Sequence, residues 1–385
     1  MAWEEHLVVE IRERFVVRAK SPKVSMSAAC REFGISRKTG YKWLQRFERE
    51  GIGGLSDRSR RPRLRRGVDG ETVLRVLELQ AKYGWGPKKL RGLLLHQGVT
   101  GAPSARTIAR ILVRAGVTRR KRRSAQMRSA PAKAPSVRAM APNDVWTLDF
   151  KGWWRARNGE RCEPLTVRDA YSRYVLCARI MDTHATKTIQ REFVRLFRRF
   201  GVPKWMQFDN GEPFAAMQAR AGLTRLSAWF VSLGITLLRS RPGKPQDNGA
   251  HERVHLDIKN EVQSSPAGTR LAEQRALTLW RTRFNDERPH EALGMRTPSE
   301  CYYPSARAYV GPQPPRYPEG WRVRRVSAKG FIKIEGAQVF LGEGLVGHDV
   351  ALEPHGDECQ AWFYGVVLGM LKPASSVSPL PAGGT

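Results

Sequence analysis

Three acidic residues stand where their side chains could share metal ions. Asp149 and Asp209 each end a short apolar run, and Glu252 comes early in a predicted helix. A carboxylate at the end of a buried strand is costly unless it is paired or binds a cation. Mg²⁺ and Mn²⁺ prefer such oxygen ligands, and two ions about 3.5–4 Å apart are a common device for phosphodiester chemistry. We expect a two-ion site here, although each acid alone is more typical of a turn residue or a helix cap.

Short strands and an amphipathic helix must position these acids. Strand-type runs of apolar and β-branched residues come at 145–150, 163–167, 174–181 and 204–208. A helical pattern at 186–200 separates the third strand from the fourth, and further helices follow. This order predicts an α/β layer with a mixed sheet and flanking helices.

The end of the chain has a different pattern. Beyond residue 320, β-branched and aromatic residues alternate between glycine turns, which predicts a small β-barrel over 320–372. The residues from 373 to 385 are of low complexity, and we expect them to be disordered.

Residues 1–56 have the pattern of a helix-turn-helix domain. Ala28 and Ala29 permit two helices to approach closely, Gly34 suits a left-handed turn, and Ser36 can cap the second helix. The start of such a helix meets base edges and phosphates. The candidate DNA contacts on it are Arg37, Lys38, Thr39, Tyr41 and Lys42. A plain helical hairpin is the alternative interpretation.

An arginine-rich segment follows this domain. Six of the nine residues 58–66 are arginine, and proline with like charge argues against a stable helix. We expect a linker over 57–70 that lies in a minor groove or along phosphates, the alternative being a solvated linker without contacts. The candidate DNA contacts here are Arg58, Arg60, Arg61, Arg63, Arg65 and Arg66.

Residues 71–118 predict a second domain of the helix-turn-helix kind. Ser104 can cap a helix on which Ile108 and Leu112 share an apolar face. Ser104, Arg106 and Thr107 are candidate DNA contacts near its start. Residues 119–142 are basic and rich in Ala, Ser and Pro, which predicts a second linker.

The charge of the chain is concentrated at its front. The whole chain of 385 residues holds 67 Lys and Arg against 36 Asp and Glu, and residues 1–140 hold 33 of the former and 11 of the latter. Dense positive charge predicts a polyanionic partner, nucleic acid before membrane. We find neither a run of about 18 apolar residues nor a signal peptide, so we expect a cytoplasmic protein and no membrane partner. Five scattered cysteines suggest neither disulfides nor zinc.

Five motifs in order resemble the DDE transposase/integrase superfamily, most closely bacterial insertion-sequence transposases with a retroviral-integrase-like core. The resemblance extends from about residue 143 to 305. Its motifs are Asp149-Phe-Lys-Gly-Trp-Trp, Leu165-Thr-Val-Arg-Asp-Ala-Tyr-Ser-Arg-Tyr, Gln207-Phe-Asp-Asn-Gly-Glu-Pro-Phe, Arg241-Pro-Gly-Lys-Pro-Gln-Asp-Asn-Gly-Ala-His-Glu-Arg-Val-His and Phe284-Asn-Asp-Glu-Arg-Pro-His-Glu-Ala-Leu-Gly.

The resemblance implies a ribonuclease-H-like catalytic domain over 143–305, in which Asp149, Asp209 and Glu252 are the catalytic, metal-binding triad. The interval from Asp209 to Glu252 is longer than in retroviral integrases, which leaves Asp247 and Asp257 as rivals for the third position. We favour Glu252 because it stands in the motif Asn-Gly-x-x-Glu-Arg. Lys259 is expected two turns further along the same helix, where it could hold a DNA phosphate beside the metals.

The sequence therefore predicts a multidomain DNA transposase with two N-terminal all-α modules, an α/β core and a C-terminal barrel. We expect it to bind terminal inverted repeats, cut DNA strands and join them to target DNA. It would need two Mg²⁺ or Mn²⁺ ions, with no zinc and no nucleotide cofactor, and would act as a homo-oligomer on double-stranded DNA at the bacterial nucleoid. The alternatives are a nuclease of the same fold that does not join, and a DNA-binding repressor derived from a transposase.

Overall fold

The computed structural model describes residues 3–58, 67–118, 137–209, 213–215, 220–239 and 249–372. The chain divides into two compact units, Met1–Asp69 and Gly70–Thr385. Most of both predicted linkers (59–66 and 119–136), the predicted tail at 373–385 and the rival acid Asp247 lie outside the described residues. The finer division into domains stays a prediction.

The first unit is a helix-turn-helix, as the sequence predicts. It contains helices α1 (Trp3–Ala19), α2 (Met26–Glu32) and α3 (Arg37–Glu50), followed by the short helix η1 (Gly51–Leu55). The Oγ of Ser36 caps α3 by accepting from the backbone N–H of Thr39, and Gly34 adopts a φ of 64° in the turn. A Cβ on Gly40 would lie 2.5 Å from Sγ of Cys30, so glycine permits α2 and α3 to pack closely.

Three more helices open the second unit. They are α4 (Gly70–Tyr83), α5 (Pro87–His96) and α6 (Ala105–Arg114). Their core is formed by Leu90, Leu94, Ile108 and Leu112, all fully buried. Ser104 caps α6 by accepting from Thr107 N–H. The pair α5 and α6, joined by an eight-residue turn, corresponds to the predicted second helix-turn-helix.

A five-stranded mixed sheet forms the centre of the second unit. Its strands are β1 (Val145–Phe150), β4 (Pro164–Asp169), β5 (Val175–Ile180), β6 (Trp205–Phe208) and β7 (Thr236–Arg239), in the order β5-β4-β1-β6-β7. The pairs β1–β4 and β4–β5 are antiparallel, whereas β1–β6 and β6–β7 are parallel. The predicted mixed sheet is thus confirmed. The sequence missed β7 and the small hairpin of β2 (Trp154–Arg155) with β3 (Arg161–Cys162).

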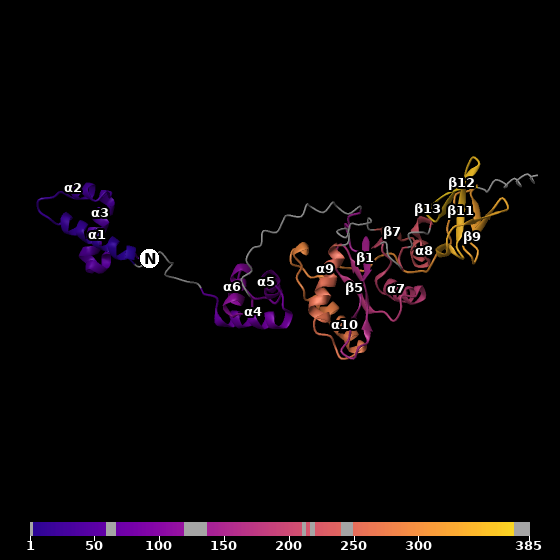
Figure 1. The fold of residues 1–385 in the computed structure, drawn as a ribbon, viewed down its shortest axis with the longest axis horizontal. Coiled ribbons are helices and arrows are strands. Elements are labelled where there is room, and N and C mark those ends of the chain that lie inside the picture. The colour runs from indigo at the N-terminus through magenta and orange to yellow at the C-terminus, as the bar shows by residue number, and fades with distance from the viewer. Residues whose placement is uncertain are drawn as a thin grey trace, which may run out of the picture. The chain divides into compact units, whose positions relative to one another are not determined.

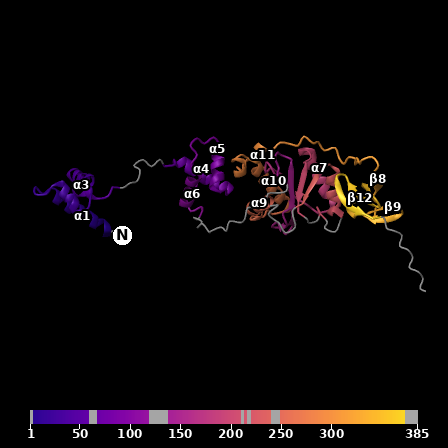
Figure 2. The same ribbon diagram turned by 90° about the horizontal axis from the view of Figure 1, so that it is seen from above.

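Helices cover both faces of this sheet (Figures 1 and 2). On one face lie α7 (Thr186–Phe200) and α8 (Arg225–Ser232), and on the other lie α9 (Gly249–Ile258) and α10 (Arg270–Asp286). A single π-helical turn, η4 (Lys259–Gln263), continues α9. Successive side chains of β1 point to opposite faces of the sheet, and each face is covered by its own layer of helices. Trp146 and Leu148 belong to the core under α7, whereas Thr147 contacts His251 of α9.

The chain then crosses toward the C-terminal strands in an extended segment that begins after the short helix α11 (Pro298–Cys301). Residues of this segment are tied to the first face of the core. Ser305 N–H donates to the carbonyl of Phe200, and the guanidinium of Arg307 donates to the carbonyls of Pro203 and Gly234. The segment is therefore held against the end of α7 along this stretch.

The C-terminal strands form two open sheets. Four strands, β8 (Arg322–Arg325), β11 (Asp349–His355), β12 (Glu358–Phe363) and β13 (Val366–Leu371), pair in the order β13-β12-β11-β8. The other sheet is the hairpin of β9 (Phe331–Ile334) and β10 (Ala337–Phe340). The β-rich end is as predicted, but its described strands do not close into one hydrogen-bonded barrel.

The open sheets share their apolar core with α8. Leu223, Ala228 and Val231 pack with the buried residues of the C-terminal strands, among them Leu345 and Phe363. A Cβ on Gly344 would lie 2.3 Å from the carbonyl oxygen of Leu223, so the two chain segments touch through backbone. The C-terminal strands are thus packed onto the central α/β layer.

Candidate active site

Asp149 lies at the end of β1, and Asp209 directly follows the neighbouring parallel strand β6. Thr147 of β1 pairs with Gln207 of β6, and each aspartate comes two residues later. Parallel strands end at the same edge of a sheet, so both carboxyl groups lie at that edge. Asp209 is exposed, whereas the side chain of Asp149 is 31% exposed.

The charge of Asp149 is strongly disfavoured. Burial, the charge of Asp209 and the charge of Glu252 together raise the pKa of Asp149 to about 7. The neighbouring carboxylates contribute to this rise because like charges destabilise one another at short range. The charges of Asp209 and Glu252 therefore both act on Asp149, the acid at the end of β1.

Glu252 lies on α9, and two histidines of the same helix hold α9 against the sheet. His251 is fully buried, with Nδ1 2.9 Å from Thr147 Oγ1 and Nε2 2.6 Å from Thr166 Oγ1. His255 Nε2 lies 2.9 Å from the same Thr166 oxygen. Because Thr166 donates its hydroxyl proton to the carbonyl of Asp149, both histidines donate to Thr166 through Nε2–H. This network links α9 to β1 and β4.

Both histidines are uncharged at neutral pH. Burial, then the charges of His255 and Arg168, lower the pKa of His251 well below its usual range. Burial and the charge of Lys151 lower the pKa of His255 to about 4. They therefore serve as neutral hydrogen-bonding groups. Neither histidine was predicted to belong to this network, although their i, i+4 spacing places them on one helix face.

The rival acid Asp257 has another role. It is buried, and its Oδ1 lies 2.8 Å from the guanidinium of Arg288, which also pairs with Glu261 at 2.9 Å. Arg288 is itself only 3% exposed. Asp257 is thus neutralised within the helical layer, which favours Glu252 as the third acid of the set.

Two lysines stand close in sequence to the acids, Lys151 after Asp149 and Lys259 after Glu252. Lys259 is exposed at the start of the π-helical turn. Lys151, two residues after Asp149, has its pKa lowered by burial and then by the charge of Lys259. Lys151 donates to Gln263 at 2.9 Å. Lys151 is a further candidate that sequence reasoning missed, although it stands in the first motif.

The chemistry of the three acids suits a hard divalent cation, because carboxylate oxygens are its preferred ligands and a cation would relieve their mutual repulsion. Within the described ranges, the structure contains no group of three or more His, Cys, Asp or Glu side chains gathered as a metal site. The acids thus interact through their charges without forming a closed cluster of ligands.

The predicted DNA contacts of the first unit lie at the start of α3. Arg37, Lys38, Tyr41 and Lys42 are exposed there, and Thr39 is half-buried. The ammonium of Lys42 also lies 4.4 Å from the centre of the Trp43 ring. This exposed row of polar and basic groups is available to a partner.

The remaining candidate DNA contacts belong to the first predicted linker and to the start of α6. Arg58 is exposed and ion-paired with Glu50. Arg106 is exposed on α6, whereas the hydroxyls of Ser104 and Thr107 bond to one another at 3.0 Å at its start. Arg60, Arg61, Arg63, Arg65 and Arg66 lie outside the described residues.

Comparison with known families identifies the class. The family described as "Integrase core domain" matches residues 139–245 and again 233–298. A "Helix-turn-helix domain" matches 11–63 and a "Homeodomain-like domain" matches 39–112. The chain belongs to the DDE transposase/integrase superfamily, among the insertion-sequence proteins with an integrase core. Its integrase core is that of a polynucleotidyl transferase family.

Individual relatives agree with this class. The chain is similar to the insertion element IS407 uncharacterized 31.7 kDa protein of Burkholderia multivorans, with 29% identity over 231 residues, 59% of this chain and 78% of the relative. It is 25% identical over 138 residues to the Gag-Pro-Pol polyprotein of Simian retrovirus SRV-1, spanning 36% of this chain but only 7% of the polyprotein.

Among solved structures, the chain is similar to the HTLV-2 integrase catalytic core domain in complex with magnesium. The identity is 16% and the TM-score 0.34, over 43% of this chain and 100% of that domain. Across the described parts of the chain, we find no helix that is both long and apolar enough to span a membrane.

Proposed function

We propose that this protein is a DNA transposase that binds the terminal inverted repeats of its element, cuts DNA strands there and joins the freed 3′-hydroxyl to target DNA. Membership of the superfamily supports a transposase role. The observation that carries the chemistry is that burial and the charges of Asp209 and Glu252 raise the pKa of Asp149 to about 7.

Asp149, Asp209 and Glu252 would hold the two divalent cations. When bound, Mg²⁺ or Mn²⁺ would activate a water or 3′-hydroxyl as nucleophile and stabilise the oxygen that leaves the phosphorus. The protein's own residues orient this site. The Thr147–His251 and Thr166–His255 contacts fix α9, and hence Glu252, relative to the strand that carries Asp149. Lys151 and Lys259 would bind phosphate oxygens beside the reacting group.

The helical modules would supply recognition. The start of α3 presents Arg37, Lys38 and Lys42 to solvent, in the arrangement by which a recognition helix enters a major groove. Since a transposase must hold both ends of its element together, we expect a dimer or larger assembly on DNA.

The test is a joining assay with labelled terminal-repeat duplexes, a plasmid target, and Mg²⁺ or Mn²⁺. Wild-type protein should cut and join, whereas Asp149→Asn, Asp209→Asn and Glu252→Gln should lose at least about a hundredfold in rate, because each removes a metal ligand worth several kcal/mol. Exposed Asp182→Asn is the matched control and should keep full activity.

Normal joining by Asp149→Asn or Asp209→Asn protein would contradict the proposed triad. Cutting without joining by the wild-type protein would indicate the nuclease alternative. Binding of the repeats with neither reaction would indicate the repressor. The double variant Arg37→Ala/Lys38→Ala should lose preference for terminal repeats over unrelated DNA, and unchanged preference would refute the recognition role of α3.

A further inference from the structure

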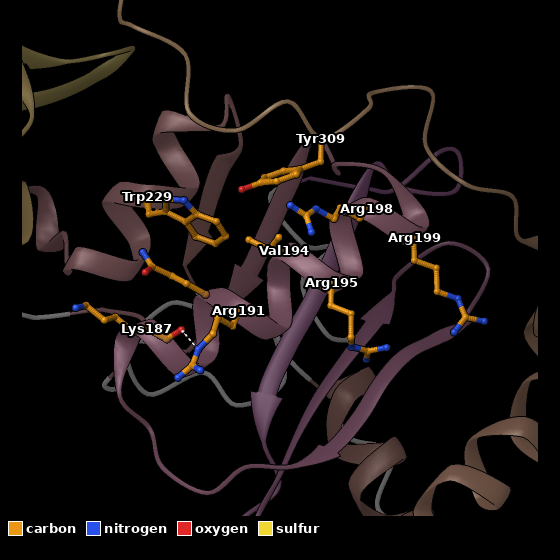
Figure 3. A pocket seen from close by; sticks show the side chains of 9 residues that line it. Lys187, Arg191, Val194, Arg195, Arg198, Arg199, Trp229 and Tyr309 are labelled. Carbon is orange, nitrogen blue, oxygen red and sulfur yellow. Dashed lines mark hydrogen bonds between the residues drawn. The ribbon is translucent and has the colours of Figure 1, made fainter.

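A basic groove of about 870 Å³ runs along the outer face of α7. Figure 3 shows basic side chains projecting from this helix on one side of the groove, with aromatic side chains on the other. The groove lies on the α7 face of the sheet, opposite the α9 face that carries Glu252 (Figures 1 and 2). The basic residues that line it are Lys187, Arg191, Arg195, Arg198 and Arg199.

Helix geometry produces this basic face. The inner face of α7 buries Ile189, Phe193, Leu196 and Phe197 in the core, so its polar residues must lie outside. Positions 187, 191, 195 and 198 follow one another at three- or four-residue intervals and share one face. At about 1.5 Å per residue they extend over roughly 16 Å, a length over which one DNA strand carries about five phosphates.

Four of the five basic side chains that line the groove have no acidic partner among the described residues. Arg195 is paired with the buried Glu192, which also lies 3.5 Å from Arg179. In contrast, no ion pair with a described acid is formed by the other four, Lys187, Arg191, Arg198 and Arg199. Arg191 donates only to the carbonyl of Lys187, at 3.4 Å. Their charges are therefore available to an anion.

The opposite side of the groove is aromatic and firmly supported. The rings of Trp229 and Tyr309 lie 5.9 and 5.8 Å from the ring of Phe197, which is buried. Tyr309 belongs to the extended segment that is tied to the core at Ser305 and Arg307. Flat rings beside cations suit a sugar-phosphate chain, because they offer apolar contact to sugars while the cations bind phosphates.

We propose that the α7 groove binds the phosphate backbone of a DNA segment other than the one held at the acids. This inference rests on the proposed function, because only a DNA-joining enzyme needs to hold two segments at once. A second copy of the chain is the competing occupant. Symmetric pairing through this face would bring two sets of unpaired cations together in a protein of net charge +31, which is unfavourable.

The experiment measures the affinity of the full-length protein for a duplex without terminal repeats, by fluorescence anisotropy at several KCl concentrations. Arg191→Ala/Arg198→Ala should bind several-fold more weakly, and the slope of log affinity against log salt should fall by about two. Arg191→Lys/Arg198→Lys keeps both charges and should keep the slope. Arg275→Ala/Lys329→Ala, which removes two exposed cations elsewhere, is the matched control.

An unchanged slope in the Arg191→Ala/Arg198→Ala protein would overturn the proposal. So would a change in its self-association without DNA, measured by sedimentation velocity, together with unchanged DNA affinity, since that result identifies a protein interface. Joining is measured on the same preparations. Absence of joining in the wild-type protein would contradict the proposed function. The slopes of log affinity against log salt would still show whether the α7 groove binds DNA.

Discussion

Nδ1 of His255 lies 3.9 Å from Oδ2 of Asp149, yet the two do not form an ion pair at neutral pH. Because the pKa of His255 is lowered to about 4, the imidazole is neutral and cannot offset the charge of Asp149. The histidine instead donates to Thr166. The acids at this edge of the sheet therefore receive no compensating positive charge from His255 at neutral pH.

The stability of the metal-free protein should fall as pH rises from about 4 to 7. The pKa of Asp149 is about 7 in the folded state, above its ordinary value of 3.8, so the folded state binds the extra proton in this range. Its contribution, up to about 4 kcal/mol, is present below pH 4 and lost as pH passes 7. Urea unfolding of wild type and Asp149→Asn across this range checks it. If the free energy of unfolding changes with pH in the same way in both proteins, Asp149 is not the group responsible.

Magnesium should stabilise the protein at pH 8, where Asp149 is ionised. A ligand that binds only the folded state at a hundredfold excess over its dissociation constant adds about 2.7 kcal/mol. Thermal unfolding with and without Mg²⁺ measures this, and Asp149→Asn should lose most of the effect. If Mg²⁺ raises the unfolding temperature of Asp149→Asn by the same amount, Mg²⁺ binds at a site that does not include Asp149.

Removal of His251 should be costly even without DNA. His251→Ala removes the short contacts to the hydroxyls of Thr147 and Thr166 and opens a cavity under α9, which predicts a loss of about 2–4 kcal/mol. His355→Ala removes a half-exposed histidine and is the control. Chemical denaturation compares them, and equal stability of the two variants would refute the pinning role of His251.

Arg288 should be more important to stability than any surface arginine. Arg288→Met leaves Asp257 and Glu261 without their buried cation, which predicts a loss of about 3–5 kcal/mol. Adding Asp257→Asn should recover part of this loss, and a double-mutant cycle measures the coupling. If the changes in the free energy of unfolding caused by Arg288→Met and Asp257→Asn simply add in the double variant, the Arg288–Asp257 pair contributes nothing to stability.

Gly40→Ala should destabilise the first unit by about 1–3 kcal/mol, because the added Cβ meets Cys30 and Phe15 at less than 3 Å. The matched control is Gly53→Ala, where a Cβ meets nothing within 4 Å. Amide hydrogen exchange of α2 and α3 in the full chain checks this. Equal protection in both variants would show that the helices can separate without cost.

Local patterns predicted much of the fold. The α7 helix and the strands β1 and β6 follow from apolar periodicity, and with them the positions of Asp149 and Asp209 at strand ends. The strand β7 was missed because its four residues show no clear alternation and pair only at the sheet edge. The roles of Thr166 and His251 could not be predicted, since their contact joins residues 85 positions apart. The same holds for Asp257, whose partner Arg288 lies on a later segment.

The packing of α8 against the C-terminal strands has a consequence for how the molecule unfolds. Leu223, Ala228 and Val231 belong to the same apolar cluster as Phe363. Cutting the chain between residues 305 and 320 would divide this cluster, and each fragment would then expose its half of the apolar surface. The α/β layer and the C-terminal strands should therefore melt in one cooperative transition. Neither should be obtainable as a stable fragment without the other.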